Sequence, residues 1–288
     1  MAANTHQVKA VIPAAGYGTR LHPFTLVVPK ELLPVRRKPM IQMAVEEAIA
    51  SGIRDIGIVI REGKEVIRDY FDVLKTASSP LNEHYNRELS RAQAELHFVF
   101  QRKPQGLGDA IYEAKDFISD SPFVMIIPDQ FVISKAPATG RLLDAARENI
   151  HAVWSSLVTV PPEELGLFPG ARRLELTSTA GNTYKVKNVQ EETGYSNGGS
   201  FVGFGRTYFP AGVVEFFSDG YLNPATGEVD LLPTFEALVE ERENYAVLLE
   251  GKAMDLGTWE GYEYFSHFLV RDNNHERDTV EHWMWETN

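Results

Sequence analysis

A loop of small residues near the start of the chain is the segment whose residue types most clearly suggest chemistry. Its small members are Ala14, Ala15, Gly16 and Gly18, and Arg20 follows two residues later. Small side chains let backbone N–H groups approach a phosphate chain, because little bulk stands in the way. The planar guanidinium of Arg20 could bracket phosphate oxygens. The loop therefore predicts a phosphate site; a tight turn without a ligand is the alternative.

Two familiar phosphate-binding loops do not fit this segment. A dinucleotide fingerprint needs a third glycine where the chain has Leu21, and a P-loop needs Lys-Ser/Thr where it has Thr19-Arg20. A second cation, Lys30, lies in the segment 29–34, which has a proline at each end. Proline restrains the backbone, which suits a charge that must point at one place. A solvated surface cation is the alternative for Lys30 and for Arg20.

Short apolar runs alternate with helical patterns over the first half of the chain. Strands are expected at 9–13, 55–61, 95–101 and 123–129, and helices at 40–50, 63–74 and 107–118. A polar, partly helical insertion interrupts this alternation at 76–94. Strands that are apolar on both faces and separated by amphipathic helices predict a parallel sheet covered by helices on each side.

The second half has a different pattern. We expect a helix at 139–149, a strand at 152–160, short strands at 172–176, 184–189 and 200–205, helices near 207–217 and 230–243, a strand at 245–251 and a helix from Trp259. The three short strands predict a small antiparallel lobe at about 162–205. The expected fold is α/β: a doubly wound, Rossmann-like mixed sheet over residues 1–270 with this lobe inserted, followed by a tail at 271–288.

Composition excludes several classes of function. Lys and Arg number 28 against 40 Asp and Glu, a net charge of −12, which argues against a nucleic-acid or anionic-membrane surface. The chain has no Cys, so disulfides, thiolate catalysis and Cys-ligated zinc are excluded. The sequence has neither 18 consecutive apolar residues nor a basic stretch followed by an apolar run at its N-terminus. We therefore expect a cytoplasmic protein.

The stretch AAGYGTRLHPFTLVVPKELLPV, residues 14–35, resembles the signature loop of the sugar-1-phosphate nucleotidylyltransferases. It is most similar to the bacterial UTP–glucose-1-phosphate uridylyltransferase branch of that family. Further motifs follow in the family's order: QRKPQGLGDA at 101–110, a strand ending in Pro-Asp at 128–129, Gly-Glu at 227–228 and Asp-Leu-Gly at 255–257. The resemblance covers nearly the whole chain, and the ordered set is specific where any one motif would be weak.

The resemblance implies roles for the nucleotide site. The loop 14–18 would wrap a nucleoside triphosphate, with Arg20 and Lys30 on its phosphates. Gln101 and Gly106 occupy the places that read a pyrimidine base in the family. An amide suits this role because its donor and acceptor match the O4 and N3–H edge of uracil or thymine. A polar strand end is the alternative for Gln101.

The resemblance also implies a metal cofactor, Mg2+, held by Asp129 and Asp255. A carboxylate at the C-terminal end of a parallel strand faces the crevice where open α/β sheets bind ligands. Magnesium takes one or two carboxylates, with water and phosphate oxygens completing its octahedron. Asp129 would thus be catalytic together with Arg20 and Lys30. A helix cap or a turn residue is the alternative for each aspartate.

For the acceptor, the resemblance assigns Gly166, Glu191 and Asn197 to the sugar pocket. Glu192 departs from the family, which has Lys at this position to bind the sugar phosphate. A carboxylate there repels a phosphate where a Lys attracts it. Three explanations stay open: Lys185 or Lys187 substitutes after a bend or a change of register, the acceptor is another phosphorylated sugar or polyol, or catalysis is weakened or absent and the fold serves binding or regulation.

The implied reaction is in-line attack of a sugar 1-phosphate oxygen on the α-phosphorus of the triphosphate, with pyrophosphate leaving. UTP or dTTP is the expected donor, and glucose 1-phosphate is the default acceptor. Another nucleoside triphosphate, or a non-catalytic sugar-nucleotide-binding regulator, is the alternative. Trp283 and Trp285 in the tail could dock on the chain itself or form an oligomer contact. We expect a homo-oligomer, a dimer or a tetramer.

Overall fold

The computed structural model describes residues 8–35, 37–76, 92–169, 172–190, 200–218 and 231–272, together with residues 87, 90 and 229. Glu191, Glu192 and Asn197 of the predicted acceptor site lie outside the described residues, as do Trp283 and Trp285. None of the helices within the described ranges is long and apolar enough to cross a membrane.

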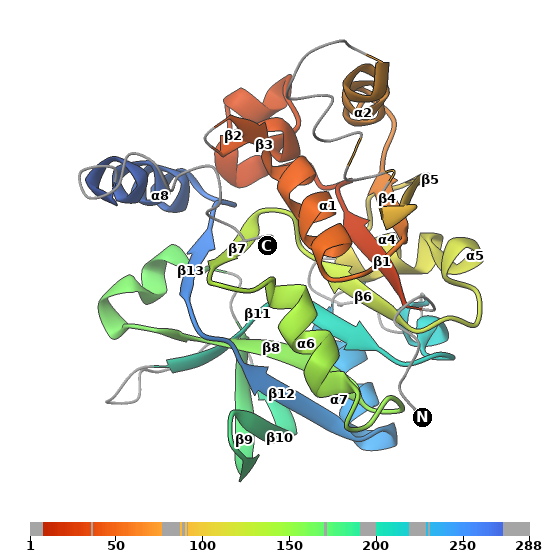
Figure 1. Ribbon diagram of the computed structural model, residues 1–288, viewed down its shortest axis with the longest axis vertical. Coiled ribbons are helices and arrows are strands. Elements are labelled where there is room, and N and C mark those ends of the chain that lie inside the picture. The colour runs from red at the N-terminus through yellow and green to blue at the C-terminus, as the bar shows by residue number, and fades with distance from the viewer. Residues whose placement is uncertain are drawn as a thin grey trace.

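A nine-stranded mixed sheet runs through the molecule in the order β5-β4-β1-β6-β11-β8-β12-β10-β9 (Figure 1). Its strands are β1 (Lys9–Pro13), β4 (Asp55–Ile60), β5 (Glu95–Phe100), β6 (Phe123–Ile126), β8 (Val153–Val160), β9 (Arg172–Ala180), β10 (Thr183–Gln190), β11 (Ser200–Phe209) and β12 (Asn244–Leu248). Strands β5, β4, β1 and β6 are parallel, and β11 is antiparallel to both β6 and β8. Strand β12 is parallel to β8, so both run in the direction of β1.

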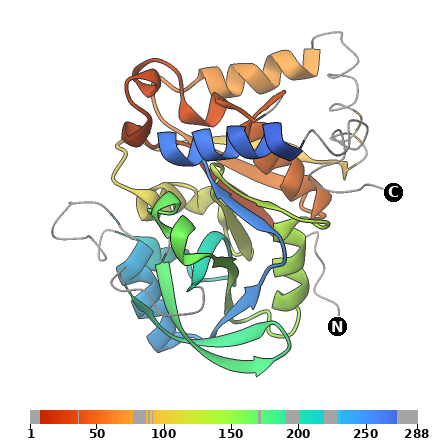
Figure 2. The same cartoon turned by 90° about the vertical axis from the view of Figure 1, so that its left-hand side faces the viewer.

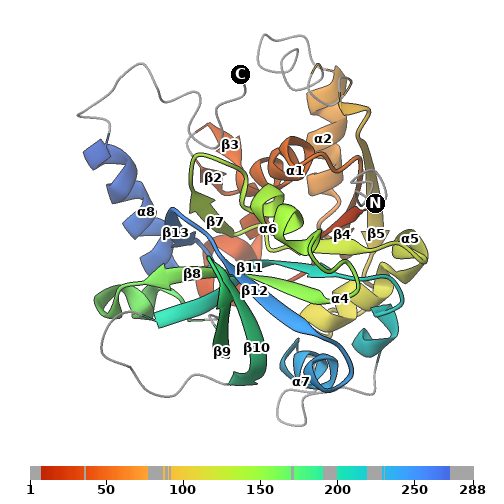
Figure 3. The same cartoon turned by 60° about the horizontal axis from the view of Figure 1, so that its bottom comes forward.

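Helices cover both faces of this sheet, as Figure 3 shows. One layer holds α1 (Met40–Ala50), α2 (Val66–Thr76) and α6 (Ala138–Ala146); the other holds α4 (Leu107–Glu113), α5 (Lys115–Ile118), the 3-10 helix η6 (Val214–Phe217) and α7 (Leu231–Glu241). Strand β1 is buried between the layers: Ala10 and Ile12 pack in the first core, and Val11 packs in the second. The alternation of apolar strands and amphipathic helices thus produces the α/β fold that the sequence predicts.

Two short antiparallel strands outside the main sheet position the predicted site. Strand β7 (Gln130–Ile133) pairs with β13 (Lys252–Asp255), and the register places Gln130 opposite Asp255. Helix α8 (Trp259–Asp272) follows β13 and packs on the N-terminal segment, as Figure 2 shows. The indole N–H of Trp259 donates to the carbonyl of His22 at 2.9 Å, and the hydroxyl of Tyr262 donates to that of Pro34 at 2.8 Å.

The remaining short elements near the site are η2 (Thr19–Leu21), η3 (Phe24–Leu26), η4 (Lys30–Leu32), η5 (Pro162–Leu167) and the small hairpin of β2 (Pro34–Val35) and β3 (Lys38–Pro39).

The structure corrects several expected elements. The helix expected at 207–217 is wrong: β11 continues to Phe209, because Thr207 and Tyr208 pair with β6 on one side and β8 on the other. The helix expected at 107–118 is divided at Ala114. Strands β9 and β10 are antiparallel, as the sequence predicts for this part of the chain, and they join the main sheet through β12.

Candidate active site

Two buried carboxylates meet at the C-terminal edge of the parallel strands. Asp129 follows β6, and Asp255 ends β13; their side chains belong to residues only 6% and 5% exposed. The N–H of Leu256 donates to the backbone carbonyl of Asp129 at 2.8 Å. The side chain of Gln130 donates to Asp255 Oδ2 at 2.9 Å. These bonds tie the turn after β6 to the turn after β13.

Gly257 lets both carboxylates approach its backbone closely, because it has no side chain. A Cβ built on Gly257 would lie 2.7 Å from Asp129 Oδ2 and 3.0 Å from Asp255 Oδ1. The N–H of Gly257 donates to Asp255 Oδ1 at 2.9 Å and so fixes that carboxylate. One or two carboxylates, completed by water and phosphate oxygens, are the ligands that Mg2+ takes in nucleotide-dependent enzymes. The residues therefore fit a divalent cation at this position.

Lys30 completes the charge pattern beside the pair. Its ammonium lies 2.5 Å from Asp129 Oδ2. Burial disfavours the charge on Lys30, but Asp129, with Glu31 and Asp255, outweighs burial and raises the pKa of Lys30. Burial likewise opposes ionisation of Asp129, yet Lys30 and, more weakly, Arg20 hold the pKa of Asp129 below its ordinary value. Asp129 is therefore the ionised member of the pair.

Asp255 behaves in the opposite way. Burial, and then the negative charge of Asp129, raise the pKa of Asp255 to about 6. The hydrogen bonds from Gly257 and Gln130 oppose this rise and only partly offset it. Either a proton or a divalent cation relieves the repulsion between the two carboxylates, so the two compete for this place.

The glycine loop makes a turn at Gly18 that Thr25 holds in place. Gly18 has φ +68°, and a Cβ there would lie 3.3 Å from Thr25 Cγ2, so this position favours glycine. The Thr25 hydroxyl donates to the Gly18 carbonyl at 2.7 Å and holds the turn. A Cβ built on Gly16 meets no atom within 4 Å among the described residues, so its outer side is open. Arg20 is exposed at the start of η2.

A buried ion pair beneath this loop was not anticipated from the sequence. The ammonium of Lys64 donates to the Ala14 carbonyl at 2.8 Å and to Glu31 Oε2 at 2.7 Å. The pair therefore joins the start of the loop to the segment that carries Lys30. One signal was available: Lys64 lies just after the second parallel strand, at the same edge where Gln101 follows the third.

Gln101 and Gly106, the predicted base-reading residues, lie in contact. Gln101 is buried, and its amide NH2 donates to the Gly106 carbonyl at 3.2 Å and to the Asp109 carboxylate. A base that meets Gln101 in this arrangement would do so through the amide oxygen. Gly106 has φ +101° and begins α4. The structure thus brings these two residues together beside the C-terminal end of β5.

Of the predicted acceptor residues, Gly166 is the one that the structure describes. Gly166 is exposed in η5, and no atom of the described residues lies within 4 Å of the place where its Cβ would be. Glu164 of the same 3-10 helix accepts hydrogen bonds from Lys252 of β13 at 2.6 Å and from the Tyr264 hydroxyl at 2.8 Å. Lys185 was considered with Lys187 as a substitute cation. Its ammonium lies 3.5 Å from Glu243 Oε1, just before β12, and thus at the N-terminal end of that strand and away from the edge that carries Asp129.

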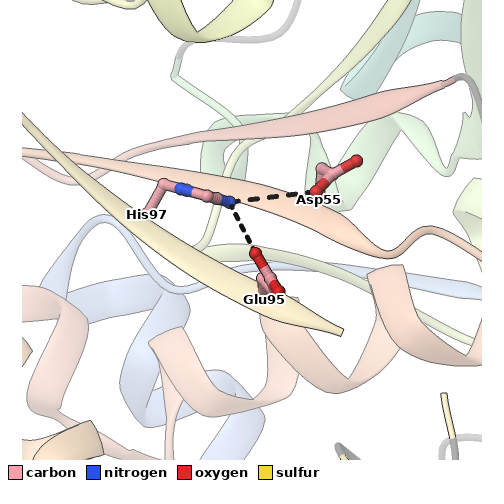
Figure 4. Close-up of side chains that lie close together, drawn as sticks. All are labelled: Asp55, Glu95 and His97. Carbon is pink, nitrogen blue, oxygen red and sulfur yellow. Dashed lines mark ion pairs between the residues drawn. The ribbon is translucent and has the colours of Figure 1, made fainter. Parts of the chain in front are cut away.

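A second cluster of possible metal ligands lies at the N-terminal ends of β4 and β5. Asp55, Glu95 and His97 offer ligand atoms that all lie within 4.8 Å of one another. Figure 4 shows His97 Nε2 directed between the two carboxylates, 3.8 Å from each. This edge of the sheet is opposite the one that carries Asp129, so the cluster is separate from the glycine loop.

Comparisons with known proteins agree with this arrangement. A family model described as nucleotidyl transferase matches residues 9–271. A UTP–glucose-1-phosphate uridylyltransferase of Bacillus subtilis is 33% identical over 261 residues, 88% of each chain. A UTP–glucose-1-phosphate uridylyltransferase 2 of Staphylococcus saprophyticus is 32% identical over 281 residues, 95% of this chain and 96% of the relative.

A solved structure of a UDP-glucose pyrophosphorylase complexed with UDP-glucose superposes with a TM-score of 0.78 at 26% identity. The match covers 92% of this chain and 99% of that one. Fold, site geometry and sequence similarity lead to the same conclusion: the chain belongs to the nucleotidyl transferase family.

Proposed function

We propose that this protein transfers the uridylyl group of UTP to glucose 1-phosphate, giving UDP-glucose and pyrophosphate, with Mg2+ as cofactor. The observation that carries the proposal is the buried pair Asp129 and Asp255, which meets beside Lys30 at the edge of the sheet that also holds the glycine loop. The named activity of the relatives, which are about one-third identical over most of the chain, supports the choice of substrates.

The reaction joins two polyanions, so positioning and neutralisation of charge dominate its catalysis. A phosphate oxygen of glucose 1-phosphate forms a new bond to the α-phosphorus of UTP, while the bond from that phosphorus to the pyrophosphate oxygen breaks. The attacking oxygen is already ionised near neutral pH, so no general base is required. The backbone N–H groups of the loop 14–18 would bind the triphosphate, and Arg20 would neutralise charge on the leaving pyrophosphate.

Asp129 and Asp255 would hold the cation. When bound, Mg2+ supplies positive charge that brings the phosphate oxygens of the two substrates together. Lys30 keeps Asp129 ionised, because its ammonium favours the carboxylate form over the protonated form. The ammonium has three donors, so Lys30 can bind Asp129 and still donate to a phosphate oxygen.

Gln101 and Gly106 would receive the uracil ring. We assign Gly166, Glu191 and Asn197 to the glucose moiety, with the carboxylate of Glu191 accepting from sugar hydroxyls. Glu192 replaces a cation of the family, and a carboxylate there would repel the phosphate of glucose 1-phosphate. A reshaped pocket that takes another sugar phosphate is therefore the alternative to test alongside glucose 1-phosphate.

The test is a pyrophosphate-release assay with purified protein, Mg2+, each of UTP, dTTP, CTP, ATP and GTP, and a panel of sugar 1-phosphates. We expect turnover with UTP and glucose 1-phosphate, abolished by EDTA and restored by Mg2+. If no pair of substrates releases pyrophosphate but calorimetry shows that UDP-glucose binds, the protein would be a binding regulator and not a transferase. Turnover with another pair would keep the chemistry and change the substrate.

The remaining expectations belong to the same proposal. We propose one nucleotidyltransferase domain over residues 1–270 with a tail at 271–288, acting in the cytoplasm as a dimer or a tetramer. Light scattering on a sizing column checks the subunit count of the full chain and of a chain ending at residue 272.

A further inference from the structure

A buried ion pair lies directly beneath the turn that carries Asp129. Arg206 of β11 and Glu47 of α1 are each about 1% exposed. The Nε of Arg206 donates to Glu47 Oε1 at 2.8 Å, and its Nη2 makes a second, close contact with Glu47 Oε2. A bidentate pair of this kind has fixed geometry as well as strength.

The remaining donors of Arg206 go to the backbone on both sides of Asp129. Its Nη1 lies 3.2 Å from the carbonyl oxygen of Ile127 and 2.7 Å from that of Gln130. The same nitrogen lies 3.2 Å from the carbonyl oxygen of Gly205 in its own strand. Arg206 therefore binds the turn two residues before Asp129 and one residue after it.

Glu47 in turn is bound by a third element. Thr139, in the first turn of α6, donates to Glu47 Oε1 through its N–H at 2.9 Å and through its hydroxyl at 2.6 Å. Burial opposes ionisation of Glu47, but Arg206 and then Thr139 hold its pKa below the ordinary value. The pair is thus charged, and its position is fixed by α1, which carries Glu47, by β11, which carries Arg206, and by Thr139 of α6.

A buried ion pair is poor evidence for stability by itself, since apolar residues of similar volume often serve as well. The backbone carbonyls of the turn, however, need donors that an apolar pair does not supply. The turn carries Asp129 and also holds Asp255 in place. The Gln130 side chain donates to Asp255, and the Asp129 carbonyl accepts from the N–H of Leu256.

We propose that Arg206 and Glu47 are positioning residues for the metal site: the pair fixes the backbone of residues 127–130 so that the Asp129 carboxylate meets Asp255 beside Gly257. This rests on the proposed function only in taking Asp129 as a metal ligand. Groups that orient a metal ligand from behind commonly change metal affinity by about 10- to 100-fold when they are altered.

The test separates positioning from stability with a double variant, Glu47→Leu with Arg206→Met. Removing both charges avoids leaving one of them buried and unpaired, while the turn carbonyls still lose their donor. The matched control is Leu142→Ala, a cavity in the same helical layer that leaves the turn contacts intact. Two quantities are measured on the full chain. The first is the Mn2+ affinity by electron paramagnetic resonance, with Asp129→Asn as the variant that defines binding outside the site. The second is the hydrogen exchange of a peptide spanning 123–131.

In the double variant we expect Mn2+ binding weakened about 10-fold or more and faster exchange over 127–130, with the control unchanged in both. Wild-type affinity and exchange in a folded double variant would overturn the inference, as would equal losses in Leu142→Ala. If the double variant does not fold, Arg206→Lys is measured in its place and the same changes in Mn2+ affinity and exchange are expected. A lysine keeps the positive charge but lacks the planar guanidinium that binds Glu47 and the turn together. Absence of Asp129-dependent Mn2+ binding in the wild type also overturns the inference. A wild type without transferase activity that still binds Mn2+ through Asp129 refutes the proposed function alone.

Discussion

Two clusters of ionisable side chains lie at opposite edges of the same sheet, and both could hold a cation on proximity alone. At the C-terminal edge, Asp129 and Asp255 are almost wholly buried. At the N-terminal edge, the side chains of Asp55, Glu95 and His97 are 41%, 74% and 42% exposed. Charges interact far more strongly away from water, so the first cluster needs a compensating charge, whereas solvent screens the exposed carboxylates of the second.

The two clusters differ in the support that surrounds their candidate ligands. The buried pair has a lysine that keeps one carboxylate ionised, a backbone N–H that fixes the other, and a glycine that lets both approach its backbone closely. It also lies at the edge of the sheet where α/β folds bind their ligands. The exposed cluster has three candidate ligands and none of this support. Proximity of ligand atoms is therefore a weaker criterion than burial, hydrogen bonding and place in the fold.

Removing the charge of Asp129 should give the largest effect. We expect Asp129→Asn to lower kcat with UTP and glucose 1-phosphate by at least about 100-fold, because the cation loses a ligand and Lys30 loses its partner. Steady-state pyrophosphate release measures this, and far-ultraviolet circular dichroism checks that the fold is kept. Activity within about tenfold of the wild type would contradict the metal role.

Adding a methyl group at Gly257, against the two carboxylates, should have the next largest effect. In Gly257→Ala the new methyl would lie 2.7 Å from Asp129 Oδ2, so one carboxylate must move. We expect the half-saturating Mg2+ concentration to rise about 10-fold, a second-sphere effect on metal affinity. Gly140→Ala is the matched control, since its Cβ meets nothing nearer than 3.5 Å and it lies in α6. Equal Mg2+ dependence in the two variants would show that the cation is elsewhere.

The raised pKa of Asp255 predicts a pH-dependent response to Mg2+. The folded metal-free protein binds this proton more tightly than the unfolded chain, whose carboxyl has an ordinary pKa of 3.8. This contribution to the free energy of unfolding is therefore present below pH 3.8 and is lost as the pH rises through about 6. The loss is on the order of 3 kcal/mol at most.

Mg2+ should restore what ionisation removes. We expect a clear rise of Tm on adding Mg2+ at pH 7.5, and little rise at pH 5, where the proton already neutralises Asp255. Thermal melts across this range, with and without Mg2+, measure the effect, and Asp255→Asn should lose the pH dependence. A Tm rise that is equal at both pH values would contradict the shared site.

The sequence predicted the periodic part of the fold well. Strand β1 and helix α1 have the bounds that their patterns indicate, 9–13 and 40–50, because each is long or strongly apolar and ends at a glycine loop or turn. Strands β7 and β13 were missed, since four-residue strands that pair only with each other carry no periodic signal. The helix expected at 207–217 failed because pairing with two neighbouring strands overrode local preference.

Only the motif residues of the candidate site were predicted from the sequence, because the charges that support them belong to no motif. Lys30, Asp129 and Asp255 were assigned by motif, and the structure brings them together. The supporting charges Lys64 and Arg206 were not found, because a charged residue is ordinarily read as exposed. Arg206 did have one signal, a single cation within the apolar run of β11. Its partner on α1 is 159 residues away, and only the folded chain brings the two together.

The smallest effect is expected at the exposed cluster. His97→Ala should leave kcat and the Mg2+ dependence within about twofold of the wild type and change the free energy of unfolding by less than about 1 kcal/mol, since exposed ion pairs contribute little. The ring of His97 packs 5.1 Å from that of Phe117, and this contact accounts for most of any loss. Steady-state assays at several Mg2+ concentrations and urea unfolding check both values. A raised half-saturating Mg2+ concentration in His97→Ala would break the comparison, because it would mean that the far edge of the sheet also takes part in metal-dependent catalysis.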